Sequence, residues 1–197
     1  ADEICFSNSN ITTYIGIEYE AILDDCLVLE ESGNIVIDIS LSAGWNWISV
    51  NAIQDNMDIN AAFSNLPAQP NDYIKSQTVA STYYDGYGWY PAFNIEVERM
   101  YLLNLENAGT MTYEGSPVDP ATASIELSSG WNWIGYIPQT SIGVNIALQN
   151  VPLIADDYIK SQTIAATYYP GYGFYPSFDM NPTAGYMLKV ESSSSFT

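Results

Sequence analysis

Aromatic side chains gather around two glycine-containing turns, and they are the residues of this sequence best suited to contact a ligand. Tyrosine and tryptophan combine a large apolar area with one polar group, so exposed rings of this kind bind sugar rings or other proteins. A strand also allows the same rings to be core residues, because alternate side chains point inward. The ligand or partner contact candidates are Tyr84, Tyr87, Trp89, Tyr90, Tyr169, Tyr172, Phe174 and Tyr175.

Both turns belong to one stretch that occurs twice. Residues 72–93 recur as residues 157–178 with five differences, at a spacing of 85. We therefore expect two tandem homologous modules, residues 34–118 (the first repeat) and residues 119–197 (the second repeat). Residues 1–33 match neither repeat and are expected to form an N-terminal β segment closed by a disulfide.

Each repeat predicts a small, mainly antiparallel sheet with one short helix, an α+β fold rich in β structure. Residues 35–47 alternate between apolar and polar, and the pattern recurs over residues 121–133. A period of two is typical of a half-buried strand, so the tryptophans that continue each apolar face are expected in the core. These tryptophans are Trp45, Trp47, Trp131 and Trp133. Gly44 and Gly130 interrupt the two strands and indicate a bulge or a bend.

A short amphipathic helix is expected over residues 59–66 and again over residues 144–151. Apolar residues recur there at i, i+3, i+4 and i+7, which is the helical spacing. Asp55, Asn56 or Asp58 can cap the first helix, and Ser141 can cap the second.

The last strand of the first repeat, over residues 110–114, has no complete counterpart in the second. The sequence ends at Thr197, where that strand should be forming. Either the chain is clipped, or the second sheet is completed by a segment from elsewhere. An open edge invites strand addition, so we expect self-association near Ser192–Thr197.

Enzymatic chemistry has little support in the residue types present. The chain has no histidine, which removes histidine-based catalytic triads and histidine metal ligands. Glu96 and Glu98 have no acidic counterparts in the second repeat, and nothing marks a carboxylate pair of the glycosidase type. We expect a protein that is not an enzyme.

Calcium is the one cofactor that the acidic residues suggest. Asp55, Asp58, Asp156 and Asp157 lie in loops of the kind that supply oxygen ligands. The EF-hand loop pattern is absent, and scattered carboxylates also suit a solvated surface.

Lys75 and Lys160 are two of only four basic residues, and both lie inside the repeated stretch. The structural interpretation is an internal ion pair with a carboxylate that fixes strand register. The functional interpretation is a contact with an acidic partner or a glycan.

Charge and cysteine content favour a secreted protein. The net charge of −19 disfavours nucleic acid and anionic membranes, and no apolar run is long enough to span a membrane. Cys5 and Cys26 are expected to form a disulfide, with two buried free thiols as the alternative. Asn10 begins the one Asn-x-Ser/Thr glycosylation sequon. The start at Ala1 looks like an end left by signal cleavage.

The ordered motifs Gly-Trp-Asn-Trp-Ile, Asp-Tyr-Ile-Lys-Ser-Gln-Thr and Tyr-Tyr-x-Gly-Tyr-Gly resemble tandem repeats of secreted and cell-surface proteins from bacteria and microalgae such as diatoms. Residues 44–48, 72–78, 130–134 and 157–163 carry the likeness. The resemblance implies an extracellular, repeat-bearing module without catalytic residues. We therefore expect a structural or adhesive subunit of a surface or filamentous assembly. The alternative is a carbohydrate-binding module that uses the aromatic turns.

Overall fold

The structure is a computed structural model that describes residues 3–4, 27–28 and 33–197. Strands dominate these residues, and antiparallel pairing joins them into several sheets. In a unit of its own, β1 (Glu3–Ile4) pairs with β2 (Leu27–Val28). Cys5, Cys26 and Asn10 lie outside the described residues, so the disulfide and the glycosylation site stay predictions.

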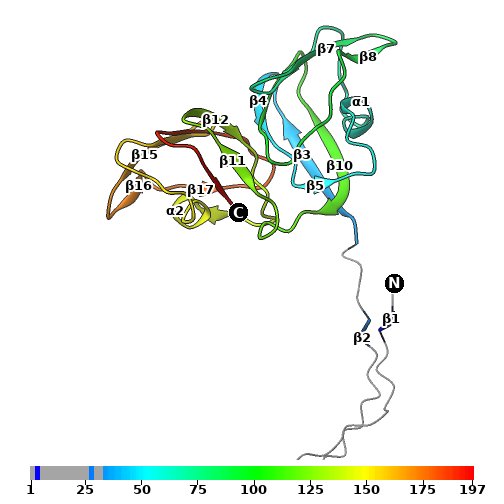
Figure 1. The fold of residues 1–197 in the computed structure, drawn as a ribbon. Helices are drawn as coiled ribbons and strands as arrows, with labels where there is room; N and C mark the ends of the chain where they lie inside the picture. Colours follow the sequence, from blue (N-terminus) through cyan, green and yellow to red (C-terminus); the bar gives the residue numbers. More distant parts are fainter. Residues whose placement is uncertain (1–2, 5–26, 29–32) are drawn as a thin grey trace, which may run out of the picture. The chain divides into compact units, whose positions relative to one another are not determined.

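The first repeat forms one five-stranded antiparallel sheet, the first sheet, beside a smaller sheet and a helix (Figure 1). In spatial order the first sheet contains β4 (Gly44–Ile48), β9 (Tyr101–Leu105), β6 (Tyr73–Lys75), β7 (Ala80–Tyr84) and β8 (Gly88–Tyr90). The smaller sheet contains β3 (Ile35–Leu41), β10 (Gly109–Pro117) and β5 (Ala52–Ile53). The helix is α1 (Ile59–Ala62).

The second repeat forms a second sheet with the same strand order. It contains β12 (Gly130–Ile134), β18 (Tyr186–Val190), β14 (Tyr158–Lys160), β15 (Ala165–Tyr169) and β16 (Gly173–Tyr175). Two further pairs are β11 (Ile125–Leu127) with β19 (Ser194–Phe196), and β13 (Ile142–Gly143) with β17 (Asp179–Met180). The second helix is α2 (Val144–Ala147).

Each sheet buries one face in a hydrophobic core of its own repeat. Ile74 and Leu103 are fully buried in the first core, and Ile159 and Leu188 occupy the corresponding positions in the second. The predicted apolar faces of both helices are confirmed where they point into these cores, with Ile59 and Val144 fully buried. The described residues are rich in β-strands and contain little helix, as expected.

The four tryptophans expected in the core lie on the outer faces of the sheets, so that prediction is wrong. Gly44 and Gly130 have φ of +84° and +96°, a left-handed conformation that glycine adopts without strain. The turn at each glycine ends one strand and begins another in a different sheet, which shifts the alternation by one residue. Asn46 and Asn132 point inward in place of the tryptophans. Trp45 and Trp131 remain 45% and 40% exposed.

Asn46 holds this turn closed through its side-chain amide. Its Oδ1 accepts a hydrogen bond from the Ser42 backbone N–H at 2.9 Å, and its Nδ2 donates to the Ser42 oxygen at 2.8 Å. The Nδ2 also donates to the Gly44 oxygen at 3.0 Å. Asn132 makes the corresponding bonds to Ser128 and Gly130. A buried amide is therefore satisfied by the backbone of the turn itself.

The helix caps differ between the repeats. Asp58 caps α1 by accepting from the Asn60 backbone N–H at 2.9 Å, as one of the expected candidates. Gly143 occupies the cap position of α2 and offers no side-chain bond. The predicted cap Ser141 is wrong, because its hydroxyl donates to the side chain of Asn181 instead.

The final strand of the second repeat does form, which corrects the expectation that it is missing. β19 pairs with β11 of its own chain through Ile125 with Phe196 and Leu127 with Ser194. One edge of residues Ser194–Phe196 is therefore occupied within the chain. The pairing is shorter than that of β10, which continues past β3 to β5.

Gly44→Ala is expected to lower the free energy of unfolding by about 1–2 kcal/mol, because an L-residue is strained in the left-handed region. An added Cβ at residue 44 meets no atom within 4 Å, so crowding does not contribute. Gly33→Ala is the matched control, since Gly33 has open space and no positive φ. Chemical denaturation measures both changes. Equal effects of the two substitutions would contradict the assignment of strain to Gly44.

Candidate functional site

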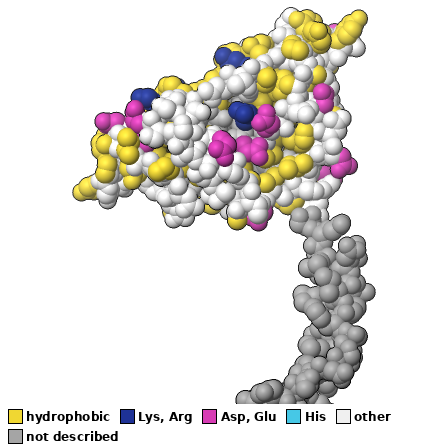
Figure 2. Space-filling model, viewed as in Figure 1, with side chains coloured by type: hydrophobic (Ala, Val, Ile, Leu, Met, Phe, Trp, Pro, Cys, Tyr) yellow, Lys and Arg dark blue, Asp and Glu magenta, His cyan; other side chains and the backbone are white. Residues whose placement is uncertain are grey.

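Among the residues that the structure describes, the most exposed aromatic side chains lie at the ends of two hairpins, β7–β8 and β15–β16. Hydrophobic side chains gather at both ends in the space-filling view (Figure 2). We call each group of three tyrosines a tyrosine tip. Tyr84, Tyr87 and Tyr90 are 48%, 89% and 70% exposed, and Tyr169, Tyr172 and Tyr175 are 49%, 90% and 73% exposed. The two tips therefore present corresponding rings to nearly the same extent.

Two features shape each tip, a glycine turn and strand alternation. Gly86 and Gly88 have φ of +73° and +81°, and the Tyr87 N–H donates to the Tyr84 oxygen at 3.0 Å. Alternation then sends Tyr83 inward while Tyr84 and Tyr90 point outward. The open question of whether these rings are core or surface is thus resolved residue by residue.

Trp89 and Phe174 belong to the core, which corrects their assignment as partner contacts. They are only 3% and 2% exposed. Each ring packs edge-on against the preceding inward tyrosine, Tyr83 or Tyr168, at 5.4 Å between ring centroids. Their faces are therefore not available to a ligand.

An asparagine of each helix fastens the hairpin to the body of the repeat. The Trp89 backbone N–H donates to Asn60 Oδ1 at 2.6 Å, and Asn60 Nδ2 donates to the Trp89 oxygen at 3.2 Å. A Cβ on Gly88 would collide with the same Asn60 oxygen. Asn145 bonds to Phe174 in the same way, with distances of 2.6 and 3.4 Å. Both tips are thus held in one orientation by equivalent contacts.

An outward row of side chains joins the first tip to the edge of its sheet. Trp45, Asn104, Tyr73, Thr82 and Tyr90 are successive partners across the strands. Trp45 and Tyr73 meet edge to face at 6.2 Å. The second sheet has the same row except that Lys189 replaces Asn104. Aromatic residues therefore occupy three of the five positions of each row, one at the tip, one on the central strand and one on the edge strand.

Lys75 and Lys160 lie among tryptophans rather than beside carboxylates. Lys75 Nζ is 6.0 Å from the Trp45 ring centroid and 5.6 Å from that of Trp133. In the part of the chain that the structure describes, the ion pairs are Arg99 with Glu96 and Lys189 with Glu191. The predicted ion pairs of Lys75 and Lys160 are therefore wrong, and cation–π contacts take their place.

Lys160 has the corresponding arrangement in the second repeat and lies near the other two tryptophans. Its Nζ is 5.6 Å from the Trp47 centroid and 5.0 Å from the Trp131 centroid. Each lysine thus contacts one tryptophan of each repeat. We call these six residues the tryptophan–lysine cluster; its members are Trp45, Trp47, Lys75, Trp131, Trp133 and Lys160.

The carboxylates that seemed suited to the lysines have other partners. Asp72 accepts from the backbone N–H groups of Gln69 and Glu106, each at 2.7 Å. Asp157 accepts from Ile154 and Glu191 in the same way. Both aspartates are almost fully buried, and these bonds satisfy the two oxygens of each. Sequence proximity alone could not reveal this competition from the backbone.

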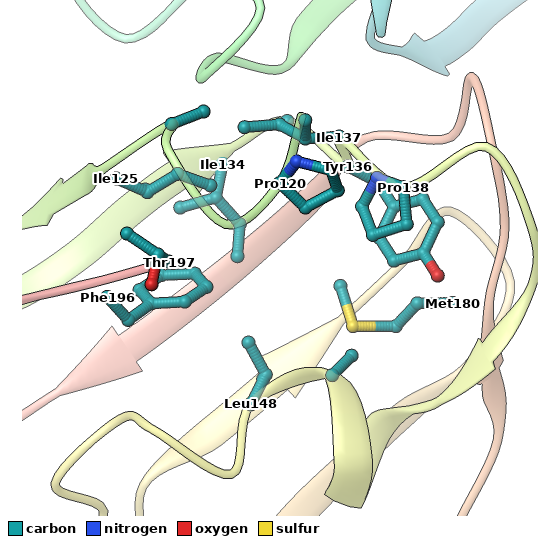
Figure 3. A pocket seen from close by; sticks show the side chains of 13 residues that line it. Pro120, Ile125, Ile134, Tyr136, Ile137, Pro138, Leu148, Met180, Phe196 and Thr197 are labelled. Carbon is teal, nitrogen blue, oxygen red and sulfur yellow. The ribbon is translucent and has the colours of Figure 1, made fainter. Parts of the chain in front are cut away.

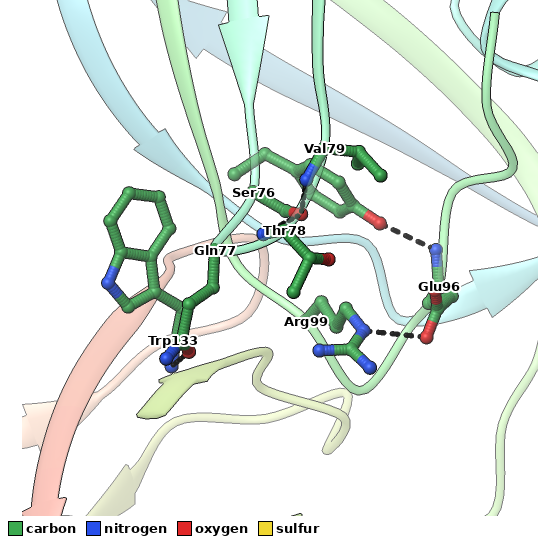
Figure 4. Close-up of polar contacts among 8 residues, drawn as sticks. Ser76, Gln77, Thr78, Val79, Glu96, Arg99 and Trp133 are labelled. Carbon is green, nitrogen blue, oxygen red and sulfur yellow. Dashed lines mark hydrogen bonds and ion pairs between the residues drawn. The ribbon is translucent and has the colours of Figure 1, made fainter. Parts of the chain in front are cut away.

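One glutamine of each repeat forms hydrogen bonds with the edge strand of the other repeat. Gln77 Oε1 accepts from the Trp133 N–H at 3.0 Å (Figure 4). Gln77 Nε2 donates to the Trp131 oxygen at 2.8 Å. Gln162 makes the reciprocal bonds to Trp47 and Trp45 at 2.9 and 2.7 Å. The edge strands β4 and β12 are therefore covered at these residues. The repeated Lys-Ser-Gln motif indicated no such role in the sequence.

A polar hollow of about 350 Å³ lies beside this contact. Glu96, Glu98, Arg99 and Glu126 line it, and Arg99 Nε donates to Glu96 at 2.7 Å (Figure 4). Tyr101 accepts from the Glu96 backbone N–H at 2.8 Å, and burial raises the pKa of Tyr101 to about 12. Glu96 is thus tied to an arginine within this hollow.

The four aspartates considered for calcium do not come together. Asp58 caps α1, and Asp157 accepts hydrogen bonds from backbone N–H groups. Asp55 and Asp156 are exposed. Over residues 3–4, 27–28 and 33–197, no group of three or more acidic, histidine or cysteine side chains is placed to hold a metal ion.

No helix within the described ranges is long and apolar enough to cross a membrane. Comparison of the chain with protein families, with curated proteins and with solved structures finds no match in any of the three.

Asn60→Ala is expected to lower the free energy of unfolding by about 1–3 kcal/mol, because it leaves the partly buried Trp89 N–H and oxygen without a partner. Asn145→Ala should have a similar effect in the second repeat. Asn107→Ala is the control, since Asn107 is exposed and makes no side-chain hydrogen bond to a described residue. Thermal and urea unfolding measure the changes. A cost for Asn60→Ala no greater than that of the control would contradict the fastening role.

Proposed function

We propose that this chain is a non-catalytic structural or adhesive module of an extracellular assembly, which contacts its partners through the two tyrosine tips. The observation that carries the proposal is the equal exposure of three tyrosines at corresponding positions of both repeats. Large exposed apolar surfaces of this kind mark interaction sites. Asparagine side chains hold both hairpins in place, so little conformational freedom is lost on binding.

In this proposal the chain contains two homologous modules, residues 34–118 and residues 119–197. The shared strand order and the reciprocal Gln77 and Gln162 contacts support it. Two tips on one chain make bivalent contact possible, and bivalency increases avidity when both sites reach their targets. The acidic, lysine-poor composition and the resemblance to cell-surface repeats support a secreted location. Calcium has no part in this proposal.

Self-association is the second element of the proposal. β19 is paired on one side with β11, and the described pairings leave its other side open. Strand addition near Ser192–Thr197 would use this edge. Such contacts would join copies into an assembly, while the tips remain available for adhesion.

A variant with serine at Tyr84, Tyr87, Tyr90, Tyr169, Tyr172 and Tyr175 is expected to lose adhesion to the native surface material. Its melting temperature should stay close to that of the unchanged chain, because these rings lie outside the core. The control carries serine at Val36, Ile53 and Ile146, which are exposed apolar residues away from the tips. Adhesion in a pull-down that survives in the tip variant would overturn the proposal.

Carbohydrate binding is the alternative function, and one observation favours it. Tyr84, Tyr87 and Tyr90 line a single apolar hollow of about 350 Å³, which is within the usual size of small-molecule sites. Exposed tyrosine rings suit the apolar faces of sugar rings.

A glycan array tests this alternative directly. If the hollow binds sugars, Tyr87→Ala should weaken binding of the recognised glycan at least tenfold. Val79→Ala is the control, because Val79 is exposed but does not line the hollow. Binding that is equal in both variants would exclude the hollow as the sugar site.

A further inference from the structure

Three of the four basic residues lie on the outer faces of the two sheets, in a chain with 23 acidic residues. Lys75, Lys160 and Lys189 each follow directly after a buried core residue, so strand alternation turns their side chains outward. Lys75 and Lys160 belong to the tryptophan–lysine cluster, and Lys189 is the cross-strand partner of Trp131. Each cluster lysine contacts a ring of the other repeat. The two outer faces therefore meet in the cluster, and positive charge gathers there.

The ammonium groups on this surface can accept an anionic partner. Among the residues that the structure describes, no carboxylate oxygen lies within 4.0 Å of the Nζ of Lys75 or Lys160. Both lysines are only half-buried. Lys189 Nζ lies 3.7 Å from Glu191, with both side chains largely exposed. Exposed ion pairs of this kind are weak, so a ligand carboxylate can replace Glu191.

Two open tryptophan rings lie beside these charges. Trp45 and Trp131 are the most exposed rings of the cluster, and exposed apolar surface that is bordered by polar groups marks interaction sites. Asn104 lies between Trp45 and Tyr73 in the outward row, and its side chain makes no hydrogen bond to a described residue. Rings, ammonium groups and an amide match the apolar faces, the carboxylates and the hydroxyls of an acidic sugar.

The backbone around the cluster disfavours a polypeptide strand as the ligand. Gln77 and Gln162 already bond to backbone groups of all four cluster tryptophans. Strand addition requires such groups to be free for main-chain hydrogen bonds. A saccharide binds through its ring faces and substituents instead, so the covered strand edges do not exclude it.

Two neighbouring spaces suit an acidic sugar less well than this surface. Three glutamates line the polar hollow beside Trp133 and would repel a carboxylate. The cavity beside Leu148 in the second repeat is mainly apolar and measures about 50 Å³ (Figure 3), which is room for only a few water-sized molecules. The ligand is therefore placed at Trp45 and Trp131, neither of which lines either space.

We propose that the outer surface around Trp45 and Trp131 binds a uronate-bearing polysaccharide. Sugar carboxylates pair with Lys75 and Lys160, while the apolar faces of the sugar rings lie against the two exposed tryptophans. This site is independent of the tyrosine tips, and no tip residue belongs to it. Because corresponding groups come from both repeats, an oligomer that reaches both lysines binds more tightly than a single uronate.

The test titrates the full 197-residue chain with oligomers of galacturonate, glucuronate and mannuronate, while nuclear magnetic resonance follows the indole N–H signals. At least one oligomer is expected to shift the signals of Trp45 and Trp131 but not that of Trp89, which lies in the core. The methyl ester of the same oligomer keeps the rings without the charge, and it should bind about tenfold more weakly. Equal binding of the ester, or no shift with any uronate up to about millimolar concentration, would overturn the proposal. Equal binding of polyglutamate would also overturn it, by making the ligand an acidic peptide.

Single charge removals provide the second arm. Lys75→Gln and Lys160→Gln are each expected to weaken binding of the uronate oligomer about tenfold. Arg99→Gln is the matched control, because it removes the same charge from a residue outside the cluster. Equal losses in all three variants would reduce the effect to net charge and contradict the site. The ester comparison uses the unchanged chain, so it stands even if a variant folds poorly. The serine tip variant should bind the oligomer normally, which separates this site from the tips.

Discussion

The backbone conformation at Gly44 and Gly130 is the constraint on which both repeats depend. A positive φ at these residues lets an apolar strand turn and continue in a different sheet with its alternation shifted by one residue. The residues before the turn contribute their apolar face to the core, and the tryptophans after it face outward. Asn46 and Asn132 close the turn from inside. Without this shift, the outer surface would lose the rings that join the two repeats.

The outward tryptophan rings provide the contacts of two of the four basic residues in this acidic chain. Lys75 and Lys160 each contact tryptophans from both repeats, and exposed cation–π contacts stabilise by about 0.5–1 kcal/mol each. The glutamines and the loops near Gly185 and Met100 complete the joint. Gly185 donates to the Trp47 oxygen at 3.1 Å, and Met100 donates to the Trp133 oxygen at 3.4 Å. The edges of β4 and β12, otherwise open to aggregation, are thus covered reciprocally.

Local patterns in the sequence predict the helix faces, the glycine turns and strands such as β3, but residues 73–84 form the two paired strands β6 and β7 rather than one. These patterns fail where a side chain's orientation or partner depends on a residue distant in the sequence or on the backbone. Periodicity through Gly44 suggested buried tryptophans, because a change of phase leaves no mark in residue type. Lys75 seemed to require a carboxylate, but backbone N–H groups occupy Asp72. Trp89 appeared equivalent to its neighbouring tyrosines until strand alternation and Asn60 placed it inside.

One difference between the repeats lies in the turns of the two tyrosine tips. Asn60 and Asn145 hold the two hairpins through the same atoms, and the exposed tyrosines match position by position. Between them, however, Asp85 in the first turn is replaced by Pro170 in the second. The first tip therefore carries a negative charge beside its rings, whereas the second carries none. Because the ring geometry is shared, this charge is a physical basis on which the two tips can discriminate between an anionic and a neutral partner.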